Sequence, residues 1–272
     1  MNKKREFIIK RLKDLENKIG RRPVKRDDSY LYSLSREYFG SWNNMMSFVG
    51  YNCRNFQKPF IPNKHSPDLY YFLGLVSTDG HIQAIEEKSH YRVLLYTSEK
   101  EEVNVILKII QRLFGYRASV RARKTEFSLR PNYEIYISSK IIAEFLNKLG
   151  IPFGAKSSTI RLPKAIIHCN DGKFWNYIRG VFDGDGSIIF SGGNTIFKIS
   201  SGSIGFLNDL NKIFFKKGFK TFKVSFQDKN VWELRTNTRA DIRKLYSLVY
   251  NGPYFYPRKK SKWEIILREQ HV

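Results

Sequence analysis

An internal repeat constrains the fold of this 272-residue chain more than any other feature of its sequence. When the Asp-Gly pair at 79–80 is placed over the Asp-Gly pair at 185–186, residues 92–116 fall against residues 195–219. In both segments a strand-like stretch leads through a Ser-containing turn into an amphipathic helix that ends in glycine and an aromatic residue. The repeat predicts two similar halves in a pseudo-two-fold arrangement, which is the intramolecular form of a symmetric dimer.

The match between the halves continues beyond this helix. Alternating polarity predicts a hairpin in each half, over 118–124 with 134–138 and over 220–226 with 231–236. A last helix is predicted in each half, over 139–149 and over 238–250. The fold class is therefore α+β, with two αββαββα halves behind a small helical domain. The predicted divisions are a helical module at 1–50, a linker at 51–65, a first repeat at 66–165 and a second repeat at 166–272.

The charge balance indicates a polyanionic partner. The chain holds 48 Lys and Arg against 25 Asp and Glu, a formal net charge of +23. Such an excess repels itself in a compact fold unless a polyanion relieves it, and nucleic acid is the usual polyanion. We see no apolar stretch long enough to span a membrane, so no membrane partner is expected. The two cysteines, Cys53 and Cys169, are too few for a disulfide framework or a Cys-based zinc site and indicate a reduced intracellular setting.

Each half opens with a helix that ends in Asp-Gly. An acidic residue at a helix C-terminus meets the negative end of the helix dipole, which is unfavourable unless a cation binds there. Small residues also recur four apart, Gly74 with Thr78 and Gly180 with Gly184. Small residues at this spacing allow two helix backbones to approach closely. We therefore expect the two helices to pack side by side, with both aspartates at one end.

Paired carboxylates predict a divalent metal. Two carboxylates held close together repel unless a metal or a proton intervenes. Mg²⁺ prefers oxygen ligands and can take the rest of its shell from substrate phosphates. Metals so placed activate water and stabilise the leaving oxygen in phosphodiester hydrolysis. A single Asp-Gly is usually only a turn, but two at matched positions of a repeat favour the metal site. Mg²⁺ is the expected cofactor, with Mn²⁺ or Ca²⁺ able to substitute in binding.

The two Asp-Gly segments resemble a known family motif. FLGLVSTDG at 72–80 and IRGVFDGDG at 178–186 are similar to the two motifs of single-chain LAGLIDADG homing endonucleases. The resemblance implies that the last acid of each motif is catalytic and binds metal, and that Asp183 is structural. It places the expected metal site at Asp79, Asp185, Thr78 and Gly184. The first motif departs from the pattern at Ser77 and Thr78, which predicts looser helix packing and slower cleavage.

The resemblance also implies a lysine near the end of each repeat, close to the metal cluster. AKSSTIRLP at 155–163 resembles the family's lysine-containing segment, so Lys156 is the first candidate. RKKSKWEII at 258–266 occupies the matching place in the second repeat. Aligning Lys-Ser with Lys-Ser pairs Lys156 with Lys260, and Lys259 is the alternative. A lysine here would hold a water or stabilise developing negative charge, although basic residues in this chain can also simply contact phosphates.

The N-terminal residues 1–50 show apolar residues at helical spacing over three short stretches, 4–18, 28–38 and 42–48. Short helices joined by tight turns are typical of a helix-turn-helix module. Through GRRP at 20–23 and YFGSWN at 38–43, this stretch resembles the small helical repeat often attached to homing endonucleases. The resemblance implies DNA contacts outside the main target. A basic stabilising cap is the alternative.

The family resemblance further implies that each sheet forms half of a saddle over the DNA major groove. Arg117, Arg121 and Arg123 alternate along one predicted strand, so they are expected on one face. Arginine can read guanine, and lysine can contact phosphate. The DNA-binding residues expected are Arg117, Arg121, Arg123, Lys198, Lys220, Lys223, Arg235 and Lys259.

These features together predict an intron-encoded monomer that cuts double-stranded DNA at a long asymmetric site, with no obligate protein partner. Its expected location is intracellular, in the cytoplasm and nucleoid or in an organelle matrix. A DNA-binding regulator without catalysis and an RNA-splicing maturase remain alternatives on the same fold. Retention of both motif aspartates favours the nuclease.

Overall fold

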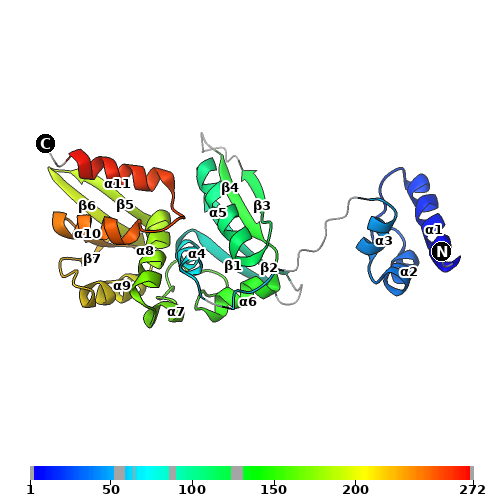
Figure 1. Ribbon diagram of the computed structural model, residues 1–272, viewed down its shortest axis with the longest axis horizontal. Coiled ribbons are helices and arrows are strands. Elements are labelled where there is room, and N and C mark those ends of the chain that lie inside the picture. Colours follow the sequence, from blue (N-terminus) through cyan, green and yellow to red (C-terminus); the bar gives the residue numbers. More distant parts are fainter. Residues whose placement is uncertain (1–2, 52–58, 64, 86–89, 124–130, 270–272) are drawn as a thin grey trace. The chain divides into compact units, whose positions relative to one another are not determined.

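A computed structural model describes residues 3–51, 59–63, 65–85, 90–123 and 131–269 of the chain (Figure 1). The chain forms two compact units, residues 1–57 and residues 58–272. The boundary between these units falls within the segment 51–65 that the sequence predicts as a linker. Each unit has a hydrophobic core of its own.

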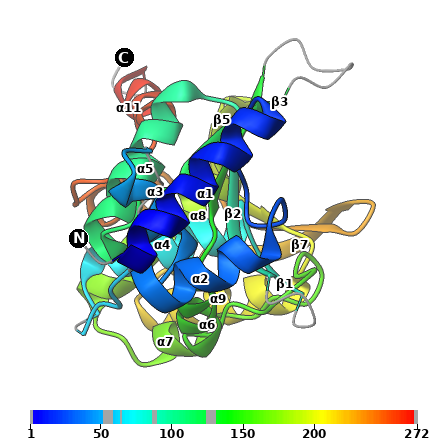
Figure 2. The ribbon, with the colours of Figure 1, turned by 90° about the vertical axis from the view of Figure 1, so that its right-hand side faces the viewer.

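The described residues 3–51 of the first unit form three helices, which confirm the predicted ones: α1 (Lys3–Ile19), α2 (Ser29–Phe39) and α3 (Trp42–Phe48). Asp28 begins α2 by accepting a hydrogen bond from Leu31 N, and Arg11 of α1 forms an ion pair with the same carboxylate at 2.7 Å. Helix α2 packs against both α1 and α3, and α1 runs in a different direction from α2 (Figure 2). The shared core of the three helices consists of Ile8, Leu12, Leu31, Trp42, Met45 and Met46.

The second unit contains the two repeats. The first repeat consists of α4 (Pro67–Thr78), β1 (Gly80–Ile85), β2 (His90–Thr97), α5 (Lys100–Phe114), β3 (Ser119–Arg123), β4 (Asn132–Ile137) and α6 (Lys140–Lys148). The short helix α7 (Lys164–Ile167) precedes the second repeat. That repeat consists of α8 (Asp171–Asp185), β5 (Gly186–Ser191), β6 (Asn194–Ser201), α9 (Ile204–Lys216), β7 (Lys223–Asp228), β8 (Val231–Thr236), α10 (Arg239–Val249) and α11 (Pro257–Glu269).

The two sheets have the same topology and matched registers. Their strand orders are β1-β2-β4-β3 and β5-β6-β8-β7, and all neighbours are antiparallel. Gly80 pairs with Leu95 in the first sheet, and Gly186 pairs with Ile199 in the second. Leu95 and Ile199 in turn pair with Ile135 and Leu234. The predicted αββαββα halves and their pseudo-two-fold relation are therefore confirmed.

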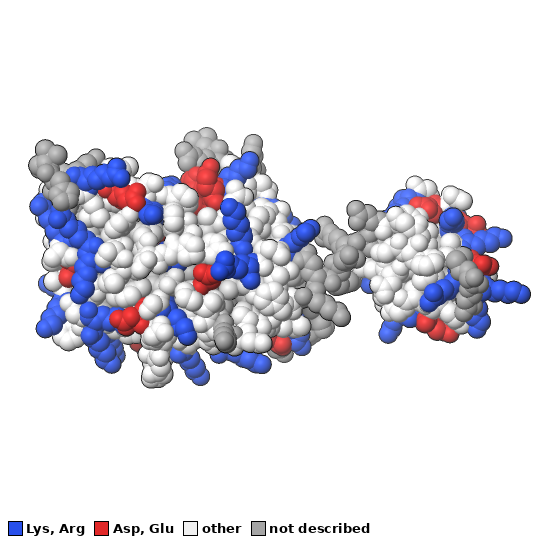
Figure 3. Space-filling model, viewed as in Figure 1, with Lys and Arg blue, Asp and Glu red and all other residues white. Residues whose placement is uncertain are grey.

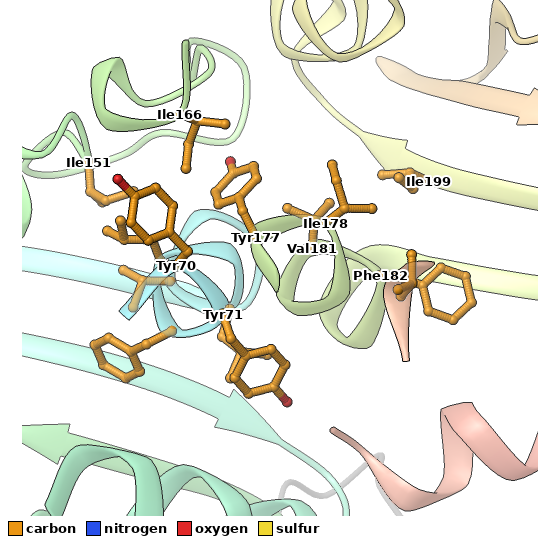
Figure 4. Packing of buried hydrophobic residues seen from close by; sticks show 14 of the residues in the cluster. Tyr70, Tyr71, Ile151, Ile166, Tyr177, Ile178, Val181, Phe182 and Ile199 are labelled. Carbon is orange, nitrogen blue, oxygen red and sulfur yellow. The ribbon is translucent and has the colours of Figure 1, made fainter. Parts of the chain in front are cut away.

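Helices α4 and α8 lie side by side between the two sheets (Figure 1). A Cβ atom at Gly74 would lie 2.3 Å from Tyr177 O, and one at Gly180 would lie 2.1 Å from Tyr71 O. Only glycine leaves room for backbones this close. Figure 4 shows Tyr71, Tyr177 and Val181 among the buried side chains at this contact. The predicted close packing of the two Asp-Gly helices is thus present.

Helix α11 was not predicted, because its sequence is highly charged and shows only a weak apolar pattern. Pro257 occupies its first position, which suits the fixed φ of proline. Its apolar side is short, with Trp263 fully buried and Ile266 largely buried. The helix places the basic residues at 258–260 on different sides of one turn, which bears on the choice between the two candidate lysines.

We expect Gly180→Ala to destabilise the second unit, because the added methyl group must displace the backbone of α4. Overpacking of this kind costs about 1–3 kcal/mol or more. Urea denaturation followed by tryptophan fluorescence would measure the change in the free energy of unfolding.

Gly172→Ala is the matched control for this change. It lies in the first turn of the same helix, where a Cβ atom would meet only Asn170 Oδ1, at 3.8 Å. Its effect should be neutral or slightly stabilising, since alanine is the better helix former. Equal costs for the two variants would show that the α4–α8 contact is not limiting.

Candidate active site at the ends of the paired helices

The C-terminal ends of α4 and α8 bring two carboxylates together. Asp79 follows the last turn of α4 and is half-buried, whereas Asp185 ends α8 and is exposed. A Cβ atom at Gly184 would lie 3.1 Å from Asp79 Oδ2, so the first carboxylate reaches across to the opposite helix. The structure therefore places Asp79 and Asp185 where the sequence predicts them, at one end of the helix pair.

Both carboxylates sit in an environment that disfavours their charge. Burial, and then the nearby charges of Asp185 and Glu102, raise the pKa of Asp79 to about 7. Asp185 is exposed as a residue, but neighbouring groups partly desolvate its carboxyl, which raises its pKa against the opposing effect of Lys156 and Lys259. A cation at this position would relieve the repulsion.

Two lysines close the site, one from each repeat. Lys156 Nζ donates to Ser77 O at 2.5 Å and to Thr78 O at 3.0 Å, at the C-terminal end of α4. Lys259 Nζ donates to Gly184 O at 3.2 Å and to Gly186 O, at the end of α8. Burial lowers the pKa of both amines, while Asp79 and neighbouring acids act in the opposite sense. Each lysine therefore caps the helix of its own repeat beside the carboxylates.

The structure corrects the pairing of Lys156 with Lys260. Lys259 occupies the matching place, whereas Lys260 lies over the Phe255 ring at 4.4 Å and faces Glu264 at 3.8 Å. Successive side chains on a helix point about 100° apart, so α11 can direct only one of the two lysines at the end of α8. Aligning the Lys-Ser pairs misses this because residues 156–159 form a turn and residues 257–269 form a helix.

The carbonyl oxygens of Thr78 and Gly184 each accept a hydrogen bond from one of these lysines. They lie beside the carboxylates, as expected. A metal ion would have to share these oxygens with the lysine ammonium groups. Their part as metal ligands therefore stays a prediction, and the two carboxylates are the better oxygen donors for a hard cation.

The divergent residues of the first motif are well packed, which contradicts the expected loosening. Ser77 Oγ donates to Leu73 O at 2.8 Å and accepts from Tyr177 OH at 3.1 Å. The side chain of Thr78 fits against Gly184, where a Cβ atom would lie 2.1 Å from Thr78 Oγ1. The bulkier residue on one helix is thus matched by the absence of a side chain on the other. The effect on cleavage stays a prediction.

Asp183 connects neighbouring segments of the protein, in keeping with the structural role expected for it. Its buried carboxylate accepts hydrogen bonds from Tyr71 OH at 2.8 Å, Tyr250 OH at 3.1 Å and Tyr256 N at 2.8 Å. Tyr71 therefore contacts Asp183 across the helix pair, just as Tyr177 contacts Ser77. Burial nevertheless raises the pKa of Asp183 to about 7, against the lowering effect of its three donors. These bonds tie α8 to the segment that leads into α11 and Lys259.

Sequence reasoning missed a cross-repeat ion pair beside the site. Glu102 of α5 is buried, accepts a hydrogen bond from Thr97 Oγ1 and lies 3.4 Å from Arg258 Nη2 of α11. A buried acid on the apolar side of an amphipathic helix was the available signal. The pair joins the first repeat to the helix that carries Lys259.

The predicted DNA-binding residues occupy different environments. Arg121 and Arg123 share the outer face of the first sheet, where Arg123 pairs with Glu134 at 3.0 Å. Arg117 precedes β3 and lines a hollow beside α5 with Lys108 and Tyr254, so it does not continue the strand alternation. Figure 3 shows how Lys and Arg outnumber acidic residues on the visible surface.

In the second sheet, Lys198, Arg235 and Lys223 form one cross-strand row. Lys198 pairs with Glu233, and Arg235 and Lys223 are exposed. Lys220 lies outside the strands, in the connection between α9 and β7. Like charges directly opposite each other are destabilising in a sheet, so this row favours an anionic ligand.

The fold and the site define a pseudo-dimeric α+β protein with a two-carboxylate centre at its helix pair. Residues 66–150 match the family model of a LAGLIDADG-like domain, and residues 3–52 match that of a homing endonuclease associated repeat. The two matches lie at the first Asp-Gly motif and at the N-terminal helices, where the sequence resemblance is seen. The second repeat shares the fold through its matched sheet register.

Similar proteins cover different shares of the chain. The homing endonuclease I-DmoI aligns with a TM-score of 0.52 and 16% identity over 68% of this chain and 97% of its own. I-WcaI bound to its DNA recognition sequence aligns with a TM-score of 0.52 and 14% identity, over 80% and 92%. The alpha subunit of ribonucleoside-diphosphate reductase NrdEB from Bacillus subtilis is 26% identical over 168 residues, which are 58% of this chain but 15% of that protein. The structural matches show the fold.

The structure also bears on the expectations about membranes and cysteines, within the residues that it describes. None of their helices is long and apolar enough to cross a membrane. Cys169 is a free, half-buried cysteine whose pKa is raised by burial. Cys53 lies outside the described residues.

The raised pKa of Asp79 predicts a pH-dependent cost of folding in the metal-free protein. An unfolded aspartate has a pKa of about 3.9, so above pH 7 the chain must fold with a disfavoured carboxylate. The free energy of unfolding should be lower for the wild type than for Asp79→Asn at pH 8, by about 1–3 kcal/mol. This difference should shrink as the pH falls toward 4, because the folded carboxyl is protonated below pH 7 and the unfolded carboxyl also begins to take up its proton near its own pKa.

Urea denaturation in EDTA at pH 8 and pH 5 would measure this difference. Asp228→Asn, at an exposed position on β7, controls for the loss of one negative charge. A stability gap between wild type and Asp79→Asn that widened toward low pH would contradict the assignment.

Proposed function

We propose that this protein is a homing endonuclease that makes metal-dependent double-strand cuts in a long, asymmetric DNA site. The observation that carries the proposal is the convergence of Asp79 and Asp185 at one end of α4 and α8. The similar structures support it: I-DmoI has been solved in complex with DNA and Mn, and I-WcaI bound to its DNA recognition sequence. The two halves differ in sequence, so each can contact a different half of a non-palindromic DNA site.

The residues present fit divalent metal. Asp79 and Asp185 supply carboxylate oxygens, which Mg²⁺ prefers, and their mutual repulsion is what a cation would remove. Mg²⁺ is the proposed cofactor, with Mn²⁺ or Ca²⁺ substituting in binding; I-DmoI complexes with DNA contain Mn or Ca. When bound, the metal would activate water for attack on the scissile phosphate and stabilise the leaving oxygen.

The protein groups around the carboxylates have separate tasks. Asp79 and Asp185 would hold the metal through their carboxylate oxygens. Lys156 and Lys259, fixed by helix-end carbonyls, place a positive charge where the phosphodiester gains negative charge in the transition state. The depressed pKa of each amine leaves it better able than a free lysine to exchange a proton with water.

DNA contacts are proposed to come from the outer faces of both sheets and from the first unit. The row of Lys198, Arg235 and Lys223 suits phosphates and base edges of one half-site, and the arginines of β3 suit the other. The protein would act as a monomer, because one chain carries both halves of the site. The proposed location is intracellular, where a DNA target would be met.

The first test is cleavage of a plasmid library that carries candidate or randomised intron-insertion sites, with Mg²⁺ present. We expect discrete double-strand ends at one long site, and none with Asp185→Asn. Sequencing of the ends would identify the target. Tight binding without cuts would overturn the nuclease and favour the DNA-binding regulator; binding to intron RNA instead would favour the maturase.

The two candidate lysines can then be separated. We expect Lys259→Met to lower the cleavage rate about 100-fold, by analogy with the loss of one transition-state donor, with little change in DNA affinity. Lys260→Met should stay within a few-fold of wild type, since its ammonium group contacts Phe255 and Glu264. Single-turnover kinetics on the identified target would measure both, and a larger loss with Lys260→Met would restore the sequence-based pairing.

A further inference from the structure

Three side chains form a stack on the outer face of the first sheet. Arg121 Cζ lies over the Tyr136 ring, 4.9 Å from its centroid, and Arg92 Cζ lies 5.5 Å from the same centroid. Both distances are within the range of cation–π attraction. We name these residues the Arg–Tyr–Arg cluster. Of the three, only Arg121 was predicted from sequence to bind DNA.

The sheet topology explains why these residues meet. Strand β4 lies between β2 and β3, so Arg92 and Arg121 approach Tyr136 from the strands on its two sides. Tyr136 pairs directly with Leu94 and Ser119, which makes each arginine a diagonal neighbour within reach of the ring. Residues 135 and 137, of the opposite face, are buried in the core. The cluster therefore belongs to the face directed away from the helices.

The Tyr136 ring holds the guanidinium groups of Arg92 and Arg121 in place, and their hydrogen-bond donors remain available. Arg123, on the same face, is engaged by the buried Glu134. Across the described ranges, by contrast, neither Arg92 nor Arg121 forms a hydrogen bond or an ion pair, and Arg92 Nε is buried without a partner. The buried Nε holds the Arg92 side chain against the sheet, and the remaining guanidinium nitrogens have no protein acceptor among the described residues.

We propose that Arg92 and Arg121 read guanines in the half-site that lies on the first sheet. This inference rests on the DNA binding of the proposed function and not on its catalysis. The guanidinium fork matches the O6 and N7 acceptors that guanine presents in the major groove, which is the commonest specific contact of arginine with DNA. Stacking on one ring fixes the orientation of both forks before DNA arrives, so less conformational entropy is lost on binding.

The second sheet lacks this cluster. By the matched registers, Arg92 corresponds to Ile196, Tyr136 to Arg235 and Arg121 to Ser225. An arginine thus stands where the first sheet has its aromatic platform, with no arginine beside it at either matched position. The stacked guanine-reading pair is therefore confined to one half of the target.

The test is a binding selection from a randomised duplex DNA library, using the full chain in Ca²⁺ so that cleavage does not contribute. Wild type should select a motif in which guanine is preferred at two positions of one half-site. Arg92→Lys and Arg121→Lys should each relax the preference at one of these positions, by about 10- to 100-fold. Tyr136→Leu should weaken both preferences, whereas Tyr136→Phe should retain them because the ring remains.

Arg123→Lys is the matched control on the same face, and any loss of affinity it causes should be uniform across sequences. If wild type selects a motif but both arginine variants keep its guanines, the inference is overturned and the proposed DNA binding stands. If wild type selects no motif, the DNA-binding part of the proposed function fails, and the inference fails with it.

Discussion

The close contact between α4 and α8 is the constraint on which the candidate site depends. Each lysine caps the end of its own helix, and each aspartate follows from its own motif, so every one of these features could exist in a separate half. Only the helix contact brings the two carboxylates together. Gly74 and Gly180 set that distance, because either side chain would collide with opposing backbone. The glycines lower helix propensity, yet they determine whether a two-carboxylate centre forms.

This contact places charge where the free protein least favours it. Two carboxylates stand at the negative ends of two helices, partly removed from water, and their pKa values rise accordingly. The lysines offset part of this, but their ammonium groups also bond the helix-end carbonyls and are themselves desolvated. A bound cation would neutralise the carboxylates, and a polyanion would neutralise the lysines. The free site therefore holds charged groups in an unfavourable environment, and substrate binding can relieve that cost.

The features that follow local pattern could be predicted from the sequence, and those set by tertiary geometry could not. Periodicity and the repeat located both sheets, the three N-terminal helices and the two aspartates. The choice between Lys259 and Lys260 required knowing that this segment is helical. Arg117 was grouped with Arg121, although the strand begins only at Ser119.

Pairs formed across strands or between the repeats left even less trace in the sequence. The Arg–Tyr–Arg cluster requires the strand order β2-β4-β3, which brings together residues from three separate segments. The ion pair between Glu102 and Arg258 joins residues far apart in the chain. No local period predicts either contact.

The two halves have diverged in ways that the helix contact permits. Residues that line the contact stay complementary, because Thr78 of α4 fits against Gly184 of α8. Asp183 and Ser77 occupy matching positions in the two motifs, and each accepts a hydrogen bond from a tyrosine of the opposite helix. Away from it, the halves differ freely: matched sheet positions hold a stacked aromatic in one and a row of cations in the other. A symmetric dimer would have to present the same surface twice. A single chain with one shared helix contact and two unlike sheet faces can bind a target whose two halves differ. Gly74 and Gly180 restrict the residues at the helix contact but not those on the outer faces of the sheets.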